Sequence, residues 1–160
     1  PQAFKSKKPP ARMFRSFFRS LRGWLSTNGF PTRWSLTRKL YVKRFFGRRA
    51  YAEVVIARYG GKPAGFALFF HNYSTFLGRP GIYLEDLFVW PEYRSKGIGR
   101  ALLVHLAKLT QKRKCGRLEW VVLNWNEPAI NFYKKLGAVP MSEWTVFRVA
   151  GDELGGLATT

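Results

Sequence analysis

The sequence has little cysteine, no long hydrophobic run and, in its first third, no acidic residue. Cys115 is the single cysteine among 160 residues, which excludes an internal disulfide and favours a reducing, cytoplasmic location. No apolar run approaches the roughly 18 residues that a membrane-spanning helix needs. A chain of this length with 46% hydrophobic residues can bury the core of one globular domain.

The absence of acidic residues from the first third makes the charge uneven. Residues 1–52 contain 14 Lys or Arg and no Asp or Glu, whereas residues 53–160 contain 14 basic and 9 acidic residues. The net charge of +19 is, at face value, typical of proteins that bind nucleic acid or anionic membranes. Because the second part has an ordinary composition, the excess charge belongs to the first 52 residues.

The second part alternates between strand and helix patterns. Two apolar runs within 51–73, separated by a Gly-Gly-Lys-Pro turn, predict a pair of strands, and 81–90 predicts a third. Residues 98–114 carry apolar side chains at helical spacing, and 126–138 predicts a short helix with Pro128 in its first turn and Gly137 at its end. Residues 116–125 and 143–149 predict two more strands. This order indicates a single α/β layer architecture.

A basic, glycine-containing turn separates the third predicted strand from the first predicted helix. It reads "RSKGIG", from Arg94 to Gly99. Gly97 and Gly99 let backbone N–H groups approach a ligand closely, and a helix N-terminus carries free N–H groups and partial positive charge. Phosphate suits such a turn. It is neither a Walker loop nor a three-glycine dinucleotide fingerprint, and by itself it could be a turn with nothing bound.

Three motifs in one order give the sequence a family resemblance. "VWPEYRSKGIGRALL", preceded by "YLEDLFV" and followed by "WNEPAINFYKKLGA", resembles the GNAT family of N-acetyltransferases, and within it the spermidine/spermine (diamine) acetyltransferase branch. The resemblance runs from about Phe45 to Leu157 and implies a GNAT domain over residues 45–160. The implied fold is α/β (α+β), with a mixed, mostly antiparallel sheet that contains a splayed parallel strand pair and is flanked by helices.

The resemblance also implies a cosubstrate, acetyl-CoA, and no metal. Acetyl-CoA would lie between splayed strands at 82–90 and 117–124. The first strand would pair with the pantetheine arm, the turn would hold the pyrophosphate, and the second helix would close the other side. The residues implied in cosubstrate binding are Leu87, Phe88, Val89, Arg94, Ser95, Lys96, Gly97, Ile98, Gly99, Arg100, Asn126 and Tyr133.

Acetyl transfer needs a neutral amine, and a free amine with a pKa of ~10.4 is protonated at neutral pH. The resemblance makes Glu85 the base, acting through water, and Tyr133 the acid that protonates the leaving thiolate. Asp86 could hold a second ammonium, and Glu143 and Trp144 would shape the amine pocket. The expected reaction is direct attack on acetyl-CoA by the primary amine of a small acceptor, namely a polyamine, a diamine or a lysine-like amino acid.

Each of these assignments has a structural alternative. Glu85 or Asp86 could be solvated, Tyr133 could belong to a helix core, and Asn126 could only cap its helix. His71 and His105 are too isolated to suggest a metal site. Alternative functions are a protein or peptide N-acetyltransferase and a basic nucleic-acid or membrane-binding module on an inactive GNAT scaffold. For the favoured function we expect no nucleic-acid partner, and the resemblance allows a homodimer.

The first part departs from the family, which begins with a strand and two helices. Its Phe, Leu and Arg pattern over 12–25 could form a basic amphipathic helix on a membrane, a transit peptide or an RNA-binding segment. A sharper hypothesis is that about residues 5–45 are an out-of-frame translation. Back-translating Met13 to Phe46 and displacing the frame by one base permits "LAEYERLPHEV", which resembles the family's missing helices. The chain as written is then expected to be impaired. Its start at Pro1 suggests an unusually defined beginning.

Overall fold

The computed structural model describes residues 51–159. Residues 1–50 of the acid-free segment lie outside these residues, as do the out-of-frame hypothesis for about residues 5–45 and the predicted boundary between residues 44 and 45. The described chain divides after Val121 into two units. Each unit is described by itself.

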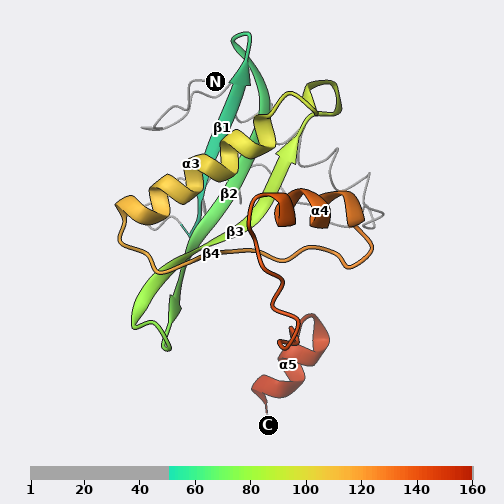
Figure 1. The fold of residues 1–160 in the computed structure, drawn as a ribbon. Coiled ribbons are helices and arrows are strands. Elements are labelled where there is room, and N and C mark those ends of the chain that lie inside the picture. The colour runs from blue at the N-terminus through green and yellow to red at the C-terminus, as the bar shows by residue number, and fades with distance from the viewer. Residues whose placement is uncertain (1–50, 160) are drawn as a thin grey trace. The chain divides into compact units, whose positions relative to one another are not determined.

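The first unit is built on a four-stranded mixed sheet (Figure 1). Its strands are β1 (Glu53–Tyr59), β2 (Lys62–Ser74), β3 (Arg79–Val89) and β4 (Leu118–Glu119), in the spatial order β1-β2-β3-β4. The first three are antiparallel neighbours, and β4 runs parallel to β3. The predicted mixed, mostly antiparallel sheet with one parallel pair is confirmed, as are the two strands joined at Gly60 and Gly61.

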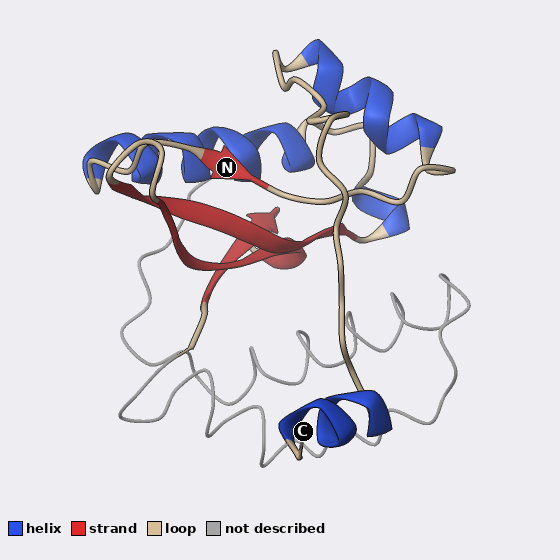
Figure 2. Ribbon diagram, turned by 90° about the horizontal axis from the view of Figure 1, so that it is seen from below, coloured by secondary structure: helices blue, strands red, loops and turns tan. Residues whose placement is uncertain are grey.

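One helix, α3 (Ile98–Lys112), covers one face of this sheet (Figure 2). Its buried side chains recur every three or four positions, as the spacing of the sequence predicted. Leu106 is fully buried, as are Phe69 of β2 and Ile82 of β3. Alternate residues of β2 face the opposite side of the sheet and form a second buried cluster. In this cluster Phe66 and Leu68 pack with Phe88 of β3. The sheet is therefore apolar on both faces.

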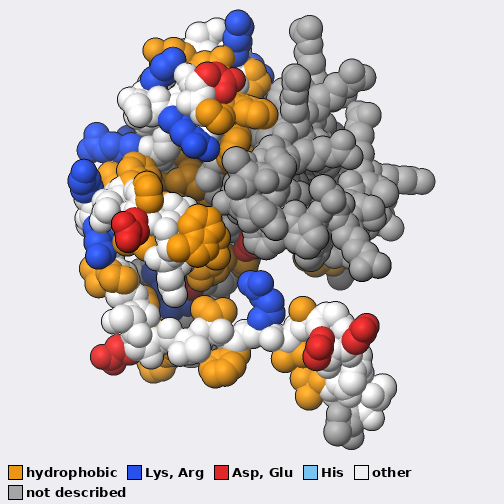
Figure 3. Space-filling model, turned by 90° about the vertical axis from the view of Figure 1, so that its right-hand side faces the viewer, with side chains coloured by type: hydrophobic (Ala, Val, Ile, Leu, Met, Phe, Trp, Pro, Cys, Tyr) orange, Lys and Arg blue, Asp and Glu red, His pale blue; other side chains and the backbone are white. Residues whose placement is uncertain are grey.

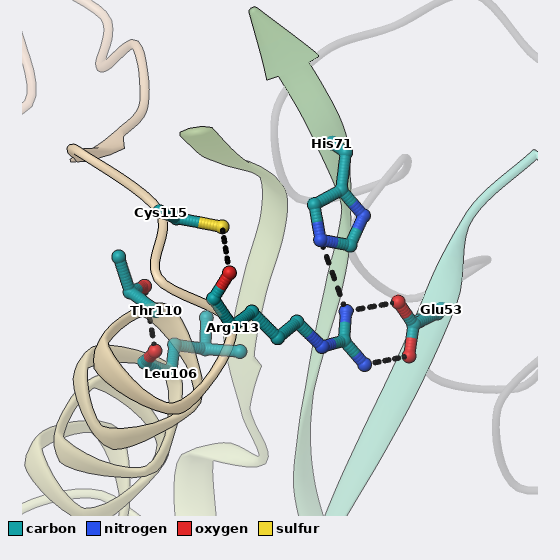
Figure 4. Close-up of polar contacts among 6 residues, drawn as sticks. All are labelled: Glu53, His71, Leu106, Thr110, Arg113 and Cys115. Atoms are coloured by element: carbon teal, nitrogen blue, oxygen red, sulfur yellow. Dashed lines mark hydrogen bonds and ion pairs between the residues drawn. The ribbon is translucent and has the colours of Figure 1, made fainter. Parts of the chain in front are cut away.

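An ion pair joins the end of α3 to the first strand (Figure 4). Arg113, the residue that follows α3, donates to both carboxylate oxygens of Glu53 on β1, at 2.5 and 2.7 Å. Its guanidinium also lies 3.3 Å from His71 Nε2 on β2 and 6.0 Å from the centroid of the Phe69 ring. Cys115 is half-buried nearby, and its Sγ lies 3.9 Å from the carbonyl oxygen of Arg113. These contacts fix the direction of α3 across the sheet.

The second unit contains α4 (Glu127–Lys135) and α5 (Asp152–Ala158). Asn126 caps α4, with its Oδ1 accepting from the Ala129 N–H at 3.3 Å. The helix ends where the Ala138 N–H donates to the Tyr133 carbonyl at 3.2 Å. The predicted short helix with Pro128 in its first turn is confirmed. No helix among residues 51–159 is long and apolar enough to cross a membrane.

Two strand predictions are wrong in extent or in kind. The strand expected over 117–124 is regular only at Leu118–Glu119, and residues 143–149, expected as a strand, form none. A strand exists only where a neighbouring strand supplies ladder hydrogen bonds, and residues 143–149 belong to no ladder of the described sheet. Their apolar side chains stay exposed, Phe147 at 91%. The helix α5, which also exposes apolar surface (Figure 3), was not predicted.

Candidate active site

A β-bulge in β3 sets the position of the two adjacent carboxylates. Leu68 of β2 pairs with Asp86, but the next residue, Phe69, pairs with Leu84. Glu85 is therefore an extra residue in β3 with no partner in the ladder, and it is exposed. A bulge of this kind bends its strand and redirects side chains. The sequence suggested that Glu85 and Asp86 alternate across a regular strand, but the bulge interrupts that alternation.

Asp86 sits in a less polar environment than Glu85. It is half-buried, and its partner across the ladder is the buried Leu68. Burial, with a smaller contribution from the negative charge of Glu85, raises the pKa of Asp86 to about 6. A carboxyl group with this pKa can accept a proton near neutral pH and return it easily. The bulge thus provides one exposed carboxylate beside one with a perturbed pKa.

The end of β3 extends beyond its parallel partner. The ladder with β4 consists of the pairs Ile82 with Leu118 and Tyr83 with Glu119. From there β3 continues through Leu87, Phe88 and Val89, which pair with β2 on the opposite edge. Phe88 is buried in the core, whereas Leu87 and Val89 are half-buried. These three residues were predicted to pair with an extended ligand, and the β4-side edge on which they lie has no ladder partner within residues 51–159.

The basic turn that follows has a fixed backbone. After a 3-10 helix, η1 (Pro91–Tyr93), the Arg94 side chain donates from Nε to the Val89 carbonyl at 3.2 Å. Ser95 has a φ of 59° and Gly97 a φ of 74°, so two residues of the turn adopt left-handed backbone. That conformation is unfavourable for serine and suits glycine. Strained backbone of this kind is more frequent at functional sites.

The turn delivers the chain directly into the N-terminus of α3. Gly97 is the N-cap and supplies no side-chain hydrogen bond, and the first turn of the helix contains no acidic residue. The first N–H groups of the helix therefore keep their partial positive charge and lack a side-chain acceptor. Ser95, Lys96 and Arg100 are exposed around this end, whereas Ile98 is buried and anchors it. The arrangement suits a phosphate group.

Two tyrosines contact the lysine of the turn. The Lys96 Nζ lies 5.1 Å from the centroid of the Tyr59 ring and 5.4 Å from that of Tyr93. The two rings are themselves 6.0 Å apart, inclined by 50°. Neither tyrosine was among the residues predicted from the sequence. Nothing in the local pattern of Tyr59, the last residue of β1, indicates that it lies beside the turn.

The remaining predicted site residues lie in the second unit. Tyr133, on α4, is half-buried, and burial raises the pKa of its phenol. Its ring centroid lies 5.4 Å from that of Phe132. Asn126 caps α4, and its part in cosubstrate binding stays a prediction. Glu143 and Trp144 are exposed, and the Trp144 N–H donates to the Met141 carbonyl in a turn at 3.2 Å.

The structure therefore brings together the predicted residues from Glu85 to Arg100, which share the end of β3 and the start of α3. The other predicted site residues, Asn126, Tyr133, Glu143 and Trp144, belong to the second unit. Among residues 51–159, no three His, Cys, Asp or Glu side chains cluster as a metal site would require.

The amino-acid sequence is similar to those of curated acetyltransferases. The chain is similar to the L-ornithine N5-acetyltransferase NATA1 of Arabidopsis thaliana, with 50% identity over 91 residues, 57% of this chain and 40% of the relative. It is similar to the thialysine N-epsilon-acetyltransferase of Mus musculus, with 38% identity over 102 residues, 62% of this chain and 59% of the relative. The chain thus spans less than two thirds of these curated relatives.

A solved structure and a family model also resemble this chain. An integron cassette protein from the mobile metagenome of V. cholerae superposes with a TM-score of 0.83 and 26% identity, covering 99% of this chain and 98% of that one. The family model of the acetyltransferase (GNAT) family matches residues 16–138. The resemblance seen in the three motifs, including that to the spermidine/spermine-like branch, is confirmed. The chain belongs to the GNAT acetyltransferase family.

Proposed function

We propose that this chain transfers an acetyl group from acetyl-CoA to the side-chain amine of a small basic amino acid. The observation that carries the proposal is the 50% identity to an ornithine N5-acetyltransferase, together with the similarity to thialysine acetyltransferases. Ornithine and thialysine each carry a primary amine on a short chain, so they are the first acceptors to test. Diamines and polyamines also carry primary amines on short chains, so they are the next acceptors to test.

The cosubstrate would lie along the end of β3 and the turn that follows. GNAT acetyltransferases use acetyl-CoA, a ligand with an extended amide-containing arm and three phosphate groups. In the proposal, the backbone of Leu87, Phe88 and Val89 pairs with the arm. The turn from Arg94 to Arg100 holds the pyrophosphate. The exposed basic residues and the first N–H groups of α3 support that role.

The amine must lose a proton before it attacks. In the proposal, Glu85 takes this proton through a water molecule, and Asp86 attracts a second positive charge of the acceptor. Glu85 is exposed at the bulge, and the pKa of Asp86 is raised to about 6. The Asp86 carboxyl group can therefore gain and lose a proton near neutral pH, directly beside the exposed Glu85. Glu143 and Trp144 are proposed to line the acceptor pocket.

The reaction then proceeds by direct attack. The amine nitrogen forms a bond to the thioester carbonyl, the tetrahedral intermediate collapses, and the carbon–sulfur bond breaks. Tyr133 is proposed to give its phenolic proton to the departing thiolate. Support comes from the direction of its pKa, which burial raises, so the phenol keeps its proton throughout the physiological range. Asn126 would close the cosubstrate site at the start of α4.

Product analysis tests the proposal. The 160-residue chain is incubated with acetyl-CoA and with ornithine, thialysine, lysine, spermidine or a peptide that has a free N-terminal amine. The products are identified by mass spectrometry. We expect acetylation of the side-chain amine of ornithine or thialysine, with Glu85→Gln and Asp86→Asn strongly reduced. Glu153→Gln, which alters an exposed carboxylate of α5, serves as the matched control. Acetylation of the peptide alone would overturn the proposed acceptor class.

A further inference from the structure

The lysine of the basic turn is held by aromatic rings. Its Nζ lies within 5.5 Å of two tyrosine ring centroids, at 5.1 Å from Tyr59 and 5.4 Å from Tyr93. An ammonium over the face of a tyrosine within about 6 Å is attracted by the ring quadrupole. Two such contacts on one lysine restrict a side chain that otherwise samples many rotamers. The position of the Lys96 charge is therefore fixed by residues outside the turn's own motif.

The two tyrosines reach the lysine from different elements. Tyr93 belongs to η1, directly before the turn, whereas Tyr59 is the last residue of β1. Because Gly65 of β2 pairs with Val89, the end of β3, the hairpin between β1 and β2 extends past that end (Figure 1). The hairpin thereby carries Tyr59 over the turn. Tyr59, which is distant from the turn in the sequence, is therefore its neighbour in the structure.

A ring and a carboxylate hold an ammonium in different ways. A carboxylate would neutralise the charge of Lys96, whereas a ring orients the ammonium and leaves its charge available to an anion. Among the described residues, the ion pairs are Glu53 with Arg113 and Arg117 with Glu119, and neither includes Lys96. Lys96 thus carries an oriented, uncompensated positive charge beside the N-terminus of α3.

We propose that Tyr59 and Tyr93 are positioning residues that hold the Lys96 ammonium for a phosphate group of acetyl-CoA. The inference rests on the proposed function, because acetyl-CoA is the ligand of that function. The phosphate is either the pyrophosphate or the 3′-phosphate of the cosubstrate. In both cases the lysine binds the anion and the two rings set where the lysine points.

Binding of CoA to the full 160-residue chain, measured by titration calorimetry, tests the inference. We expect Tyr59→Leu to raise the Kd for CoA about two- to five-fold, the change that a cation–π contact at an exposed site supports. Tyr59→Phe keeps the ring and should bind as the unmodified chain does. Tyr73→Leu, at an exposed tyrosine of β2, is the matched control and should leave the Kd unchanged. Equal losses for Tyr59→Phe and Tyr59→Leu would overturn the role of the ring.

A double substitution separates positioning from general packing. Lys96→Met should itself weaken binding, and adding Tyr59→Leu to it should change the Kd no further, because the rings then have no charge to hold. Independent, additive losses would show that Tyr59 acts without the lysine and would overturn the inference. Thermal unfolding midpoints of all variants verify that the sheet is intact.

Truncated ligands identify the phosphate. With 3′-dephospho-CoA, a persisting effect of Tyr59→Leu assigns Lys96 to the pyrophosphate, and a vanished effect assigns it to the 3′-phosphate. Both results support the inference, whereas an effect of the same size on pantetheine, which has neither group, contradicts it. If the unmodified chain binds CoA and these variants do not differ, the inference fails alone. If the unmodified chain does not bind CoA, the proposed function fails with it.

Discussion

Asn72 on β2 donates a hydrogen bond from its Nδ2 to the Glu119 Oε1 on β4, at 2.7 Å, although β3 lies between these two strands. The residue opposite Asn72 in β3 is Gly81. A Cβ at that position would meet the Asn72 Oδ1, so the asparagine crosses the strand only because glycine leaves the space. Glu119 also pairs with Arg117 Nε at 2.7 Å. These contacts hold β4 where its short parallel ladder with β3 ends.

The first prediction follows from this crossing. Gly81→Ala should destabilise the fold by about 1–3 kcal/mol, because the new methyl group displaces Asn72 and leaves the Glu119 carboxylate without that donor. The urea-unfolding midpoint measures the effect. Gly155→Ala in α5 is the matched control, since a Cβ there meets no atom within 4 Å. Equal midpoints for the two variants would show that the crossing over Gly81 is not required.

Asp86 should make the stability of the protein depend on pH. Its folded-state pKa of about 6 lies above the ordinary value of about 3.9, so the native state retains the proton more tightly than the unfolded state. Stability therefore falls as pH rises from about 4 to about 6 and stays reduced above. Asp86→Asn should be more stable than the unmodified chain at pH 8, by about 2–3 kcal/mol at most, and not at pH 4. It should also acetylate more slowly.

Chemical unfolding at the two pH values checks this expectation. Asp152→Asn, at an exposed carboxylate in the first turn of α5, should show no such pH-dependent gain. A stability difference between Asp86→Asn and the unmodified chain that is the same at pH 4 and pH 8 would mean that the carboxyl group has an ordinary pKa.

The Glu53–Arg113 ion pair should make stability depend on pH in the opposite direction, so that its contribution is lost in acid. Its hydrogen bonds to Arg113 lower the pKa of Glu53, so its contribution to stability is present above about pH 4.3 and is lost as pH falls through the lowered pKa. Glu53→Gln should cost about 0.5–1 kcal/mol at pH 7, the range of a partly exposed pair, and nothing near pH 2. Urea titrations at both pH values measure this. A cost that persists in acid would assign the effect to packing.

Tyr133 should matter for catalysis more than for folding. If its phenol protonates the thiolate, Tyr133→Phe should lower kcat about a hundredfold or more with a small change in the KM for acetyl-CoA. Because burial raises the pKa of this phenol, the unmodified chain should keep the acid function up to pH 10 or above. Tyr73→Phe on β2 is the matched control. An unchanged kcat in Tyr133→Phe would remove the tyrosine from the mechanism.

The out-of-frame hypothesis makes a prediction about the gene. The DNA around Phe45 and Phe46 should contain a T-run in which a change of one base joins the displaced upstream frame to the frame of the residues that follow. The restored chain should acetylate amines faster than the chain as written. Sequencing the gene and comparing initial rates test both parts. Stop codons or unrelated residues in the displaced frame would mean that the basic segment is genuine.

Much of the fold could be predicted because its signals are local. The Gly-Gly turn between two apolar runs located β1 and β2, and the spacing of Ile98, Leu102 and Leu106 located α3. Pro128 located the start of α4. The place of the turn from Arg94 to Gly99 directly before a helix is confirmed. Its role as an anion site stays a prediction.

The remaining features depend on contacts distant in the sequence. The bulge at Glu85 exists only in the register of β3 against β2, and the raised pKa of Asp86 follows from its burial opposite Leu68. Tyr59 meets Lys96 only because the hairpin passes the end of β3. The alternation in 143–149 resembled a strand, but alternation cannot supply the neighbouring strand that a ladder requires.

The central claim is the proposal that this chain acetylates the side-chain amine of a small basic amino acid. The most direct measurement is acetyl transfer from acetyl-CoA to ornithine, with the product identified by mass spectrometry and the unmodified chain compared with Glu85→Gln and Tyr133→Phe. The account predicts a side-chain N-acetylated product whose formation is strongly reduced in both variants. No acetylated product with ornithine, thialysine or any diamine, or equal rates in all three chains, would contradict it.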